Sequence, residues 1–73
     1  MHIERLVTMA NDIAAFFHSA VDQDEAAQNI ALHLRRYWDP RMRKQITAHC
    51  LDGGAGLSQL ALQGVQLLNR EVQ

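Results

Sequence analysis

Apolar residues recur at intervals of three and four positions in the first part of the chain, beginning at Ile3 and ending at Phe17. This interval places apolar side chains on one face of an α-helix and leaves the other face for solvent. The pattern predicts a first helix over about residues 3–19. Its apolar face holds Ile3, Leu6, Val7, Ala10, Ile13, Ala14 and Phe17, and its polar arc holds Glu4, Thr8, Asn11, Asp12, His18 and Ser19.

A second apolar stripe follows Asp22, which stands three residues before Glu25 as in a capping box. This stripe predicts a second helix over about residues 23–37. The pair Asp39-Pro40 ends that helix, because the residue before a proline is pushed out of the α region. The same pair opens the next helix, with Asp39 as the N-cap and Pro40 at the first helical position. The stripe consists of Ala26, Ala27, Ile30, Ala31, Leu34, Tyr37 and Trp38.

Two further helices follow this turn. The third, over about residues 40–52, has a short apolar face of Met42, Ile46, His49 and Cys50. The glycine-rich segment 52–56 can take positive φ at a helix C-terminus and then turn, so it separates a fourth helix over about residues 58–71. Gly64 interrupts the apolar stripe of that last helix, which indicates a close approach by another helix or a glycine that the helix tolerates. The stripe contains Leu57, Leu60, Ala61, Gly64, Val65, Leu68 and Val72.

No segment alternates with a period of two, so the sequence gives no support for a sheet. The predicted fold class is all-α, as a single domain of four helices over residues 1–73. Connections of about two to six residues favour neighbouring antiparallel helices. The four helices therefore form either an antiparallel bundle or a more irregular helical array.

The composition predicts a soluble cytoplasmic protein. The longest nearly uncharged segment, residues 55–69, carries polar side chains throughout, so no run of about 20 apolar residues exists to cross a membrane. The N-terminus lacks the basic and apolar regions of a secretory signal. Cys50 is the only cysteine, whereas small secreted domains usually need several for disulfides.

Residues that could carry catalysis or bind a metal are not arranged for either task. The four histidines, His2, His18, His33 and His49, are 15 or 16 positions apart and fall on different predicted helices, unlike the short spacings of metal sites. His49 and Cys50 point about 100° apart on a helix, which is poor geometry for a nucleophile pair. The glycine-rich segment lacks the Gly-Lys-Ser/Thr ending of a phosphate loop. We therefore expect no enzyme activity, no metal and no cofactor in this chain, with Cys50 as a small core residue.

The positive charge of the chain is concentrated in one place, although the net charge is −1. Residues 35–44, which we call the basic corner, hold five of the seven Lys and Arg residues together with Asp39. Arg35 and Arg36 fall in the last turn of the second helix, where cations complement the helix dipole. The other three cations fall in the first turn or so of the third helix, where the dipole disfavours each by about 0.3–1 kcal/mol. An acidic partner explains those three better than helix stability does.

Several apolar side chains lie outside the core arcs of their helices, and together with the basic corner they resemble a protein interface. Met9, Phe16 and Leu32 are in this group. Interfaces are enriched in aromatic, methionine and arginine side chains. The predicted partner-binding residues are Leu32, Arg35, Arg36, Trp38, Asp39, Pro40, Arg41, Met42, Arg43 and Lys44.

Three segments, residues 6–17, 30–43 and 53–57, resemble the delta subunit of NAD-dependent formate dehydrogenases. The most specific part is Trp38-Asp39-Pro40-Arg41-Met42-Arg43, which follows a helix ending in two arginines and precedes a glycine-rich turn. The resemblance implies a small non-catalytic cytoplasmic subunit that associates with the large molybdenum-containing catalytic subunit and assists assembly or maturation. It also implies that molybdopterin, iron–sulfur clusters, FMN and NAD are bound by partner subunits.

Two other functions of the basic corner stay open from the sequence. The third helix could act as a recognition helix on nucleic acid, but a pI near 6.4 and an acidic first half argue against this function. Alternatively, the isolated chain forms a homo-oligomer in which the acidic first helix of one copy meets the basic corner of another.

Overall fold

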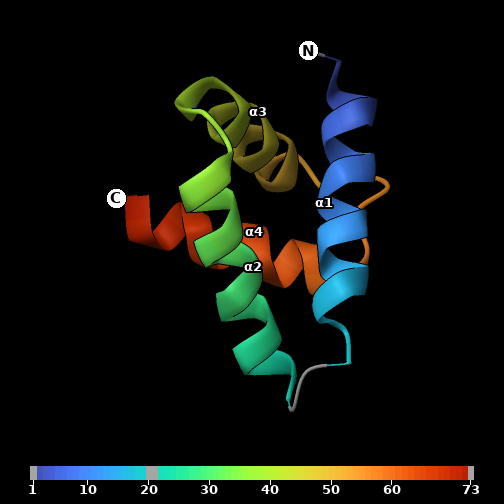
Figure 1. Cartoon of the computed structure of the whole chain (residues 1–73). Coiled ribbons are helices and arrows are strands. Elements are labelled where there is room, and N and C mark those ends of the chain that lie inside the picture. The colour runs from blue at the N-terminus through green and yellow to red at the C-terminus, as the bar shows by residue number, and fades with distance from the viewer. Residues whose placement is uncertain (1, 20–21, 73) are drawn as a thin grey trace.

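Four helices form where the periodicity of the sequence predicts them (Figure 1). The computed structural model describes residues 2–19 and 22–72, with side chains through Arg70. The helices are α1 (Ile3–Phe17), α2 (Gln23–Tyr37), α3 (Pro40–Leu51) and α4 (Gln59–Val72). The described residues contain no strand, and the all-α prediction is confirmed.

The ends of α1, α3 and α4 differ from the predicted ones by one or two residues. α1 ends at Phe17 instead of residue 19, because the N–H of His18 turns back to the carbonyl of Ala15 (3.4 Å) in a tighter turn. The end of α3 is a C-terminal glycine motif: the N–H of Gly54 donates to the carbonyl of His49 (2.9 Å), and Gly53 takes a φ of 108°. The glycine-rich segment is therefore a helix stop, as predicted.

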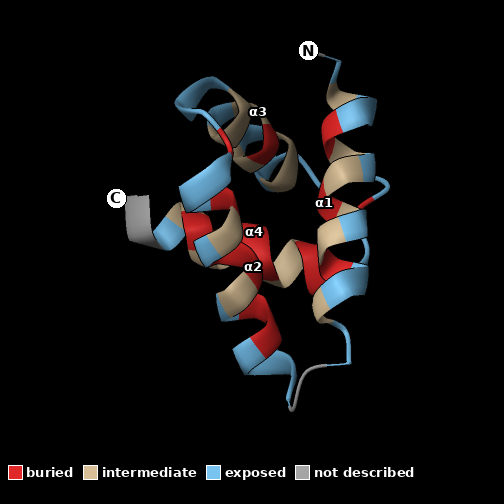
Figure 2. Cartoon of the chain, viewed as in Figure 1, coloured by how far each residue is buried: buried red, intermediate tan, exposed pale blue. Residues whose placement is uncertain are grey.

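The helices form an irregular array, not an up-and-down bundle. Figure 1 shows α4 starting beside α1 and passing across α2 instead of lying alongside them, while α3 lies at the end of the molecule where α1 begins. Inward faces of all four helices meet in one core (Figure 2). The largest fully buried side chains are Leu6, Ile30, Leu34, Ile46, Val65 and Leu68, so each helix contributes at least one.

Gly64 lies where α4 crosses α2. A methyl group added at Gly64 would stand 2.5 Å from Cγ2 and 2.8 Å from Cβ of Ile30, which is fully buried. Real side chains essentially never come so close. Of the two explanations for this glycine, the close approach of another helix is the correct one.

The predicted placement of Tyr37 in the core stripe is wrong. Tyr37 is 70% exposed, and its ring lies against His33 with the ring centroids 4.7 Å apart. Trp38 instead is only 6% exposed and belongs to the core. The chain leaves the helix at Trp38, whose extended backbone (φ −92°, ψ 140°) lets the indole turn inward in place of the tyrosine.

Asn11 connects α1 to the loop between α3 and α4, a role that its place on the predicted polar arc did not indicate. Its Nδ2 donates to the carbonyl of Gly56 (2.9 Å), and its Oδ1 accepts from the N–H of Ser58 (2.8 Å). Ser58 in turn accepts a hydrogen bond from the N–H of Ala61 through its hydroxyl (3.2 Å), as an N-cap of α4 does. One amide side chain thus fixes the loop that starts the last helix.

We predict that Asn11→Ala lowers the free energy of unfolding by about 1–2 kcal/mol, because two hydrogen bonds to the backbone are lost together. Asn11→Asp should lose less, since its carboxylate still accepts from the N–H of Ser58. Urea denaturation followed by circular dichroism measures both. Equal stability of Asn11→Ala and the wild type would show that water replaces the two hydrogen bonds of Asn11 at no cost in free energy.

Candidate partner-binding surface

The turn between α2 and α3 is held rigidly by its own residues. The carboxylate of Asp39 accepts a hydrogen bond from the N–H of Met42 (2.9 Å), and its carbonyl accepts from the N–H of Arg43 (3.1 Å). Pro40 occupies the first turn of α3. The predicted N-cap and helix start are therefore confirmed, and they fix the backbone from which the cations of α3 project.

Arg43 has a structural task that the sequence did not reveal. Its Nη1 donates a hydrogen bond to the carbonyl oxygen of Arg35 in the last turn of α2 (2.9 Å). The guanidinium therefore complements the negative end of α2, although it belongs to the first turn of α3. A partner is not needed to explain the position of this charge. Of the three cations at the start of α3, only Arg41 and Lys44 therefore still indicate an acidic partner.

Arg41 and Lys44 are both exposed; the first turn of α3 contains no acidic residue, and the N-cap Asp39 offsets only part of their charge. Each cation there is disfavoured by about 0.3–1 kcal/mol. Arg35 and Arg36 are also exposed at the end of α2. The basic corner therefore presents at least these four cationic side chains to its surroundings.

A groove of about 560 Å³ opens beside these cations. Its walls come from the end of α2, the first turns of α3 and the last turns of α4, so it includes residues that are far apart in sequence. The exposed Pro40 supplies apolar surface beside the charged side chains, whereas Leu68 borders the groove as a fully buried core residue. We call it the basic groove; it is lined by Arg35, Pro40, Arg43, Lys44, Thr47, Leu68 and Asn69.

Some apolar residues of the predicted surface are buried in the core, and others are exposed to solvent. Trp38 is buried, and Met42 is half-buried against the core, so both attach the basic corner to the core and offer little surface to a partner. Leu32 is 44% exposed, as its position outside the core stripe indicates. Of the two candidates on α1, Phe16 is 77% exposed, whereas Met9 packs partly against the core.

An aromatic row follows the seam between α1 and α2. Edge-to-face or tilted contacts join successive rings, with centroid distances of 5.1, 6.3 and 4.7 Å. A shallow groove of about 410 Å³ beside it is lined in part by Met9, Met42 and Asp12. The aromatic row consists of Phe16, Phe17, His33 and Tyr37.

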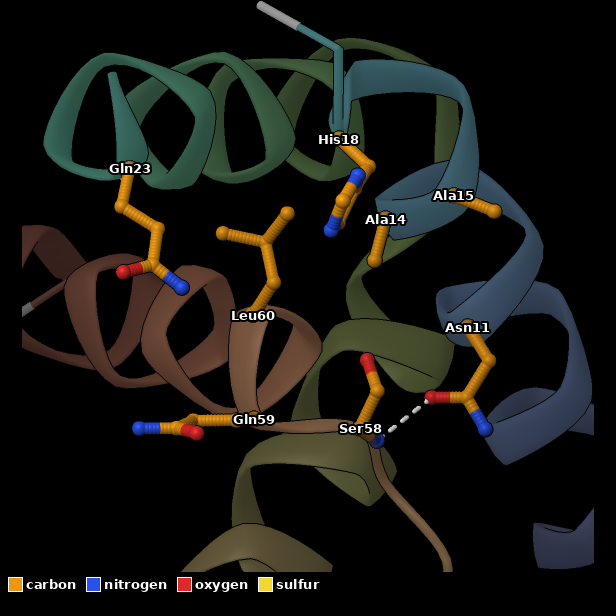
Figure 3. A pocket seen from close by; sticks show the side chains of 8 residues that line it. All are labelled: Asn11, Ala14, Ala15, His18, Gln23, Ser58, Gln59 and Leu60. Carbon is orange, nitrogen blue, oxygen red and sulfur yellow. Dashed lines mark hydrogen bonds between the residues drawn. The ribbon is translucent and has the colours of Figure 1, made fainter.

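A third hollow, of about 500 Å³, lies between α1 and the starts of α2 and α4 (Figure 3). Figure 3 shows the hydrogen bond from Ser58 to Asn11 at one edge and His18 at another. Among the described residues that line it, His18 is the one residue with an ionisable side chain, and no carboxylate or thiol accompanies it. The lining consists of Asn11, Ala14, Ala15, His18, Gln23, Ser58, Gln59 and Leu60, which do not form an acid–base pair.

No group of three or more His, Cys, Asp and Glu side chains within residues 2–19 and 22–70 is arranged to hold a metal ion. Within the same part of the chain, none of the helices has the length and apolar character needed to span a membrane. Cys50 is half-buried on α3, and burial raises the pKa of its thiol above the ordinary value.

We predict slow alkylation of Cys50 in the folded protein. Because burial raises the thiol pKa, less of the reactive thiolate is present at pH 8 than in an unfolded chain, and the reaction should accelerate only at higher pH. Iodoacetamide modification followed by mass spectrometry should proceed several-fold more slowly in buffer than in about 6 M urea, where most of the chain unfolds. Equal rates in the two solutions would contradict the burial.

The fold and this surface define a small all-helical protein that presents a rigid, positively charged corner. Comparison with known protein families matches residues 5–65 to the NADH-dependent formate dehydrogenase delta subunit FdsD. The chain belongs to this family, which confirms the resemblance found in the sequence. Comparison with curated proteins and with solved structures gave no match.

Proposed function

We propose that the chain is a non-catalytic accessory subunit that binds the large molybdenum-containing catalytic subunit of a formate dehydrogenase and supports its assembly or maturation. Family membership supports association with the formate dehydrogenase complex. In this proposal the molybdopterin, the iron–sulfur clusters, the FMN and the NAD site belong to the other subunits, and the complex is cytoplasmic.

The docking surface is inferred from two exposed cations near the N-terminus of α3, at its second and fifth positions. Arg41 and Lys44 oppose the helix dipole, and the N-cap Asp39 offsets only part of that cost. A carboxylate-bearing surface would relieve this cost and would gain charge-assisted hydrogen bonds from both side chains. The cap at Asp39 fixes the backbone that carries the two cations, so no backbone ordering is needed when the partner binds.

Charge complementarity with a protein partner also fits the whole chain better than nucleic acid does. Nucleic-acid-binding domains usually present an extended basic face, whereas this chain has a net charge of −1 and a single concentration of cations in its sequence.

Co-purification tests the proposal. An affinity-tagged chain, produced together with the catalytic subunit, should elute with it in a fixed ratio on size exclusion, and catalytic subunit produced alone should contain less molybdenum. Elution of the two proteins as separate species would contradict the proposed binding. Full molybdenum loading without the chain would contradict a role in maturation.

A further inference from the structure

The basic groove differs from the rest of the basic corner because it joins charge to an apolar surface. Arg43 and Lys44 stand at its α3 wall, and the exposed Pro40 contributes apolar surface, while Leu68 of α4 borders the groove as a fully buried core residue. Among the described residues that line it, none carries a carboxylate. A flat acidic surface would use only the charges of such a groove and would leave its apolar part in contact with water.

The geometry points to one kind of occupant: we infer that the groove receives a protruding segment of the protein partner in which Asp or Glu residues flank a bulky apolar side chain. The inference rests on the proposed function and specifies which chemistry on the catalytic subunit this chain recognises. The carboxylates bind the cations at the rim, and the apolar side chain packs on the exposed ring of Pro40.

Two features of the groove make it suited to a defined segment. Arg43 is already held by the carbonyl of Arg35 (2.9 Å), so its charge is in place before the partner arrives. Thr47 is held as well, because its hydroxyl lies 2.9 Å from the carbonyl of Arg43 and 3.0 Å from that of Lys44. A rigid wall of this kind loses little side-chain entropy on binding and favours an occupant of matching shape.

The volume of about 560 Å³ is in the range of sites that enclose a small molecule or one to a few side chains. It is larger than a single carboxylate requires. An apolar side chain beside the carboxylates would fill the remainder and would contribute affinity that salt does not screen. Binding should therefore weaken with salt without disappearing.

Blocking the groove without changing its charge tests the inference. Thr47→Trp fills the groove from its α3 wall, and Ala48→Trp places the same indole on the neighbouring exposed position of that helix as the matched control. Lys44→Glu, on the exposed surface, changes the charge at the rim, with Arg5→Glu on the exposed face of α1 as its control. Circular dichroism first establishes that each variant is folded.

Affinity for the purified catalytic subunit is then measured by biolayer interferometry. Thr47→Trp and Lys44→Glu should each weaken binding about tenfold or more, while the two controls stay within a few-fold of the wild type. Between about 0.1 M and 1 M salt, where the Debye length falls from about 10 to 3 Å, wild-type binding should weaken but persist. If the wild type and Thr47→Trp bind equally well, the groove is not the site, although the proposed subunit function stands. If the wild type does not bind at all, the proposed function itself is wrong.

Carboxylate footprinting identifies the occupant. Carbodiimide-driven coupling to glycine ethyl ester labels exposed Asp and Glu residues of the catalytic subunit, with and without the wild-type chain. Protection should fall on carboxylates that flank an apolar residue in one segment, and Thr47→Trp should abolish that protection. Protection unchanged by Thr47→Trp, or absent from all carboxylates, would overturn the inference. The inference would also be overturned if a single-stranded DNA oligonucleotide displaced the catalytic subunit and if Lys44→Glu and Thr47→Trp abolished binding of that oligonucleotide, because the groove would then recognise nucleic acid.

Discussion

Gly64→Ala should lower the free energy of unfolding by about 1–2 kcal/mol, although alanine is the better helix former. The intrinsic gain is about 1 kcal/mol for replacing glycine within a helix. The new methyl group would stand 2.5 Å from Cγ2 and 2.8 Å from Cβ of Ile30. A rotamer change of Ile30 could move Cγ2 but not Cβ, so α2 and α4 would have to separate. Overpacking of this kind typically costs about 1–3 kcal/mol, and more where backbones must move.

Such a loss is large for this chain. At about 0.05–0.15 kcal/mol per residue, a protein of 73 residues has a total stability of only about 4–11 kcal/mol. Thermal and urea unfolding followed by circular dichroism would measure the change. A loss of this size would show that the contact between α2 and α4 at Gly64 does not tolerate one added methyl group.

A double-mutant cycle isolates the cause. In an Ile30→Ala background Cγ2 is absent, so Gly64→Ala should cost less there than in the wild type, with a coupling of about 0.5–3 kcal/mol between the two positions. Gln28→Ala, at an exposed position of α2, serves as a control and should be nearly neutral. A Gly64→Ala variant as stable as the wild type would contradict the close approach of the two helices.

The second large effect is expected on binding. Reversing both exposed cations of α3, as Arg41→Glu with Lys44→Glu, should weaken association with the catalytic subunit by at least about 2 kcal/mol, or roughly 30-fold. Truncating one partner of a desolvated charge pair costs about 2–5 kcal/mol, much more than a rim contact does. Isothermal titration calorimetry or interferometry with the purified subunit measures the loss.

The same variant should be at least as stable as the wild type when it is alone. Carboxylates in the first turn of α3 complement the helix dipole, which favours each by about 0.3–1 kcal/mol, whereas the native cations oppose it. Weaker binding together with an unchanged or raised melting temperature separates an interface role from a folding role. Arg43 is unsuited to this test, because its replacement would also break the hydrogen bond to the carbonyl of Arg35.

A matched control is available in Arg5→Glu with Arg70→Glu. Both arginines are exposed and lie outside the basic corner, on α1 and α4, and the pair changes the net charge by the same amount. This control should bind nearly as well as the wild type. Equal losses in the two double variants would indicate that binding depends on net charge and not on the basic corner.

Features set by neighbouring residues were predictable from the sequence. The hydrogen bonds from Glu25 to Asp22 and from Met42 to Asp39 span three positions each, so the caps of α2 and α3 follow from local chemistry. Gly53 ends α3 for the same reason, since a positive φ is needed at the position after a helix cap. Helix periodicity then predicted the buried residues of each helix. Of the other predicted positions, Tyr37 is exposed, His49 is half-buried outside the core, and the side chain of Val72 lies outside the described residues.

Features that depend on how the helices cross were not predictable. Asn11 binds a loop 45 to 47 residues away, and nothing in its neighbourhood distinguishes it from other polar residues of α1. Likewise, Leu68 and Asn69 join the basic groove only because α4 passes across α2. Of the candidate surface, the sequence located the cations, but the groove among them required the packing of three helices.

Hydrogen exchange of the assembled complex shows whether the chain binds the catalytic subunit through the basic corner. The isolated chain and the complex with the catalytic subunit are compared by mass spectrometry of their peptides. We expect slower exchange on binding in peptides that cover the basic corner, residues 35–44, and the first turns of α3, with little change in the first half of α1. Protection confined to α1, or none over residues 35–47, would contradict docking through this corner.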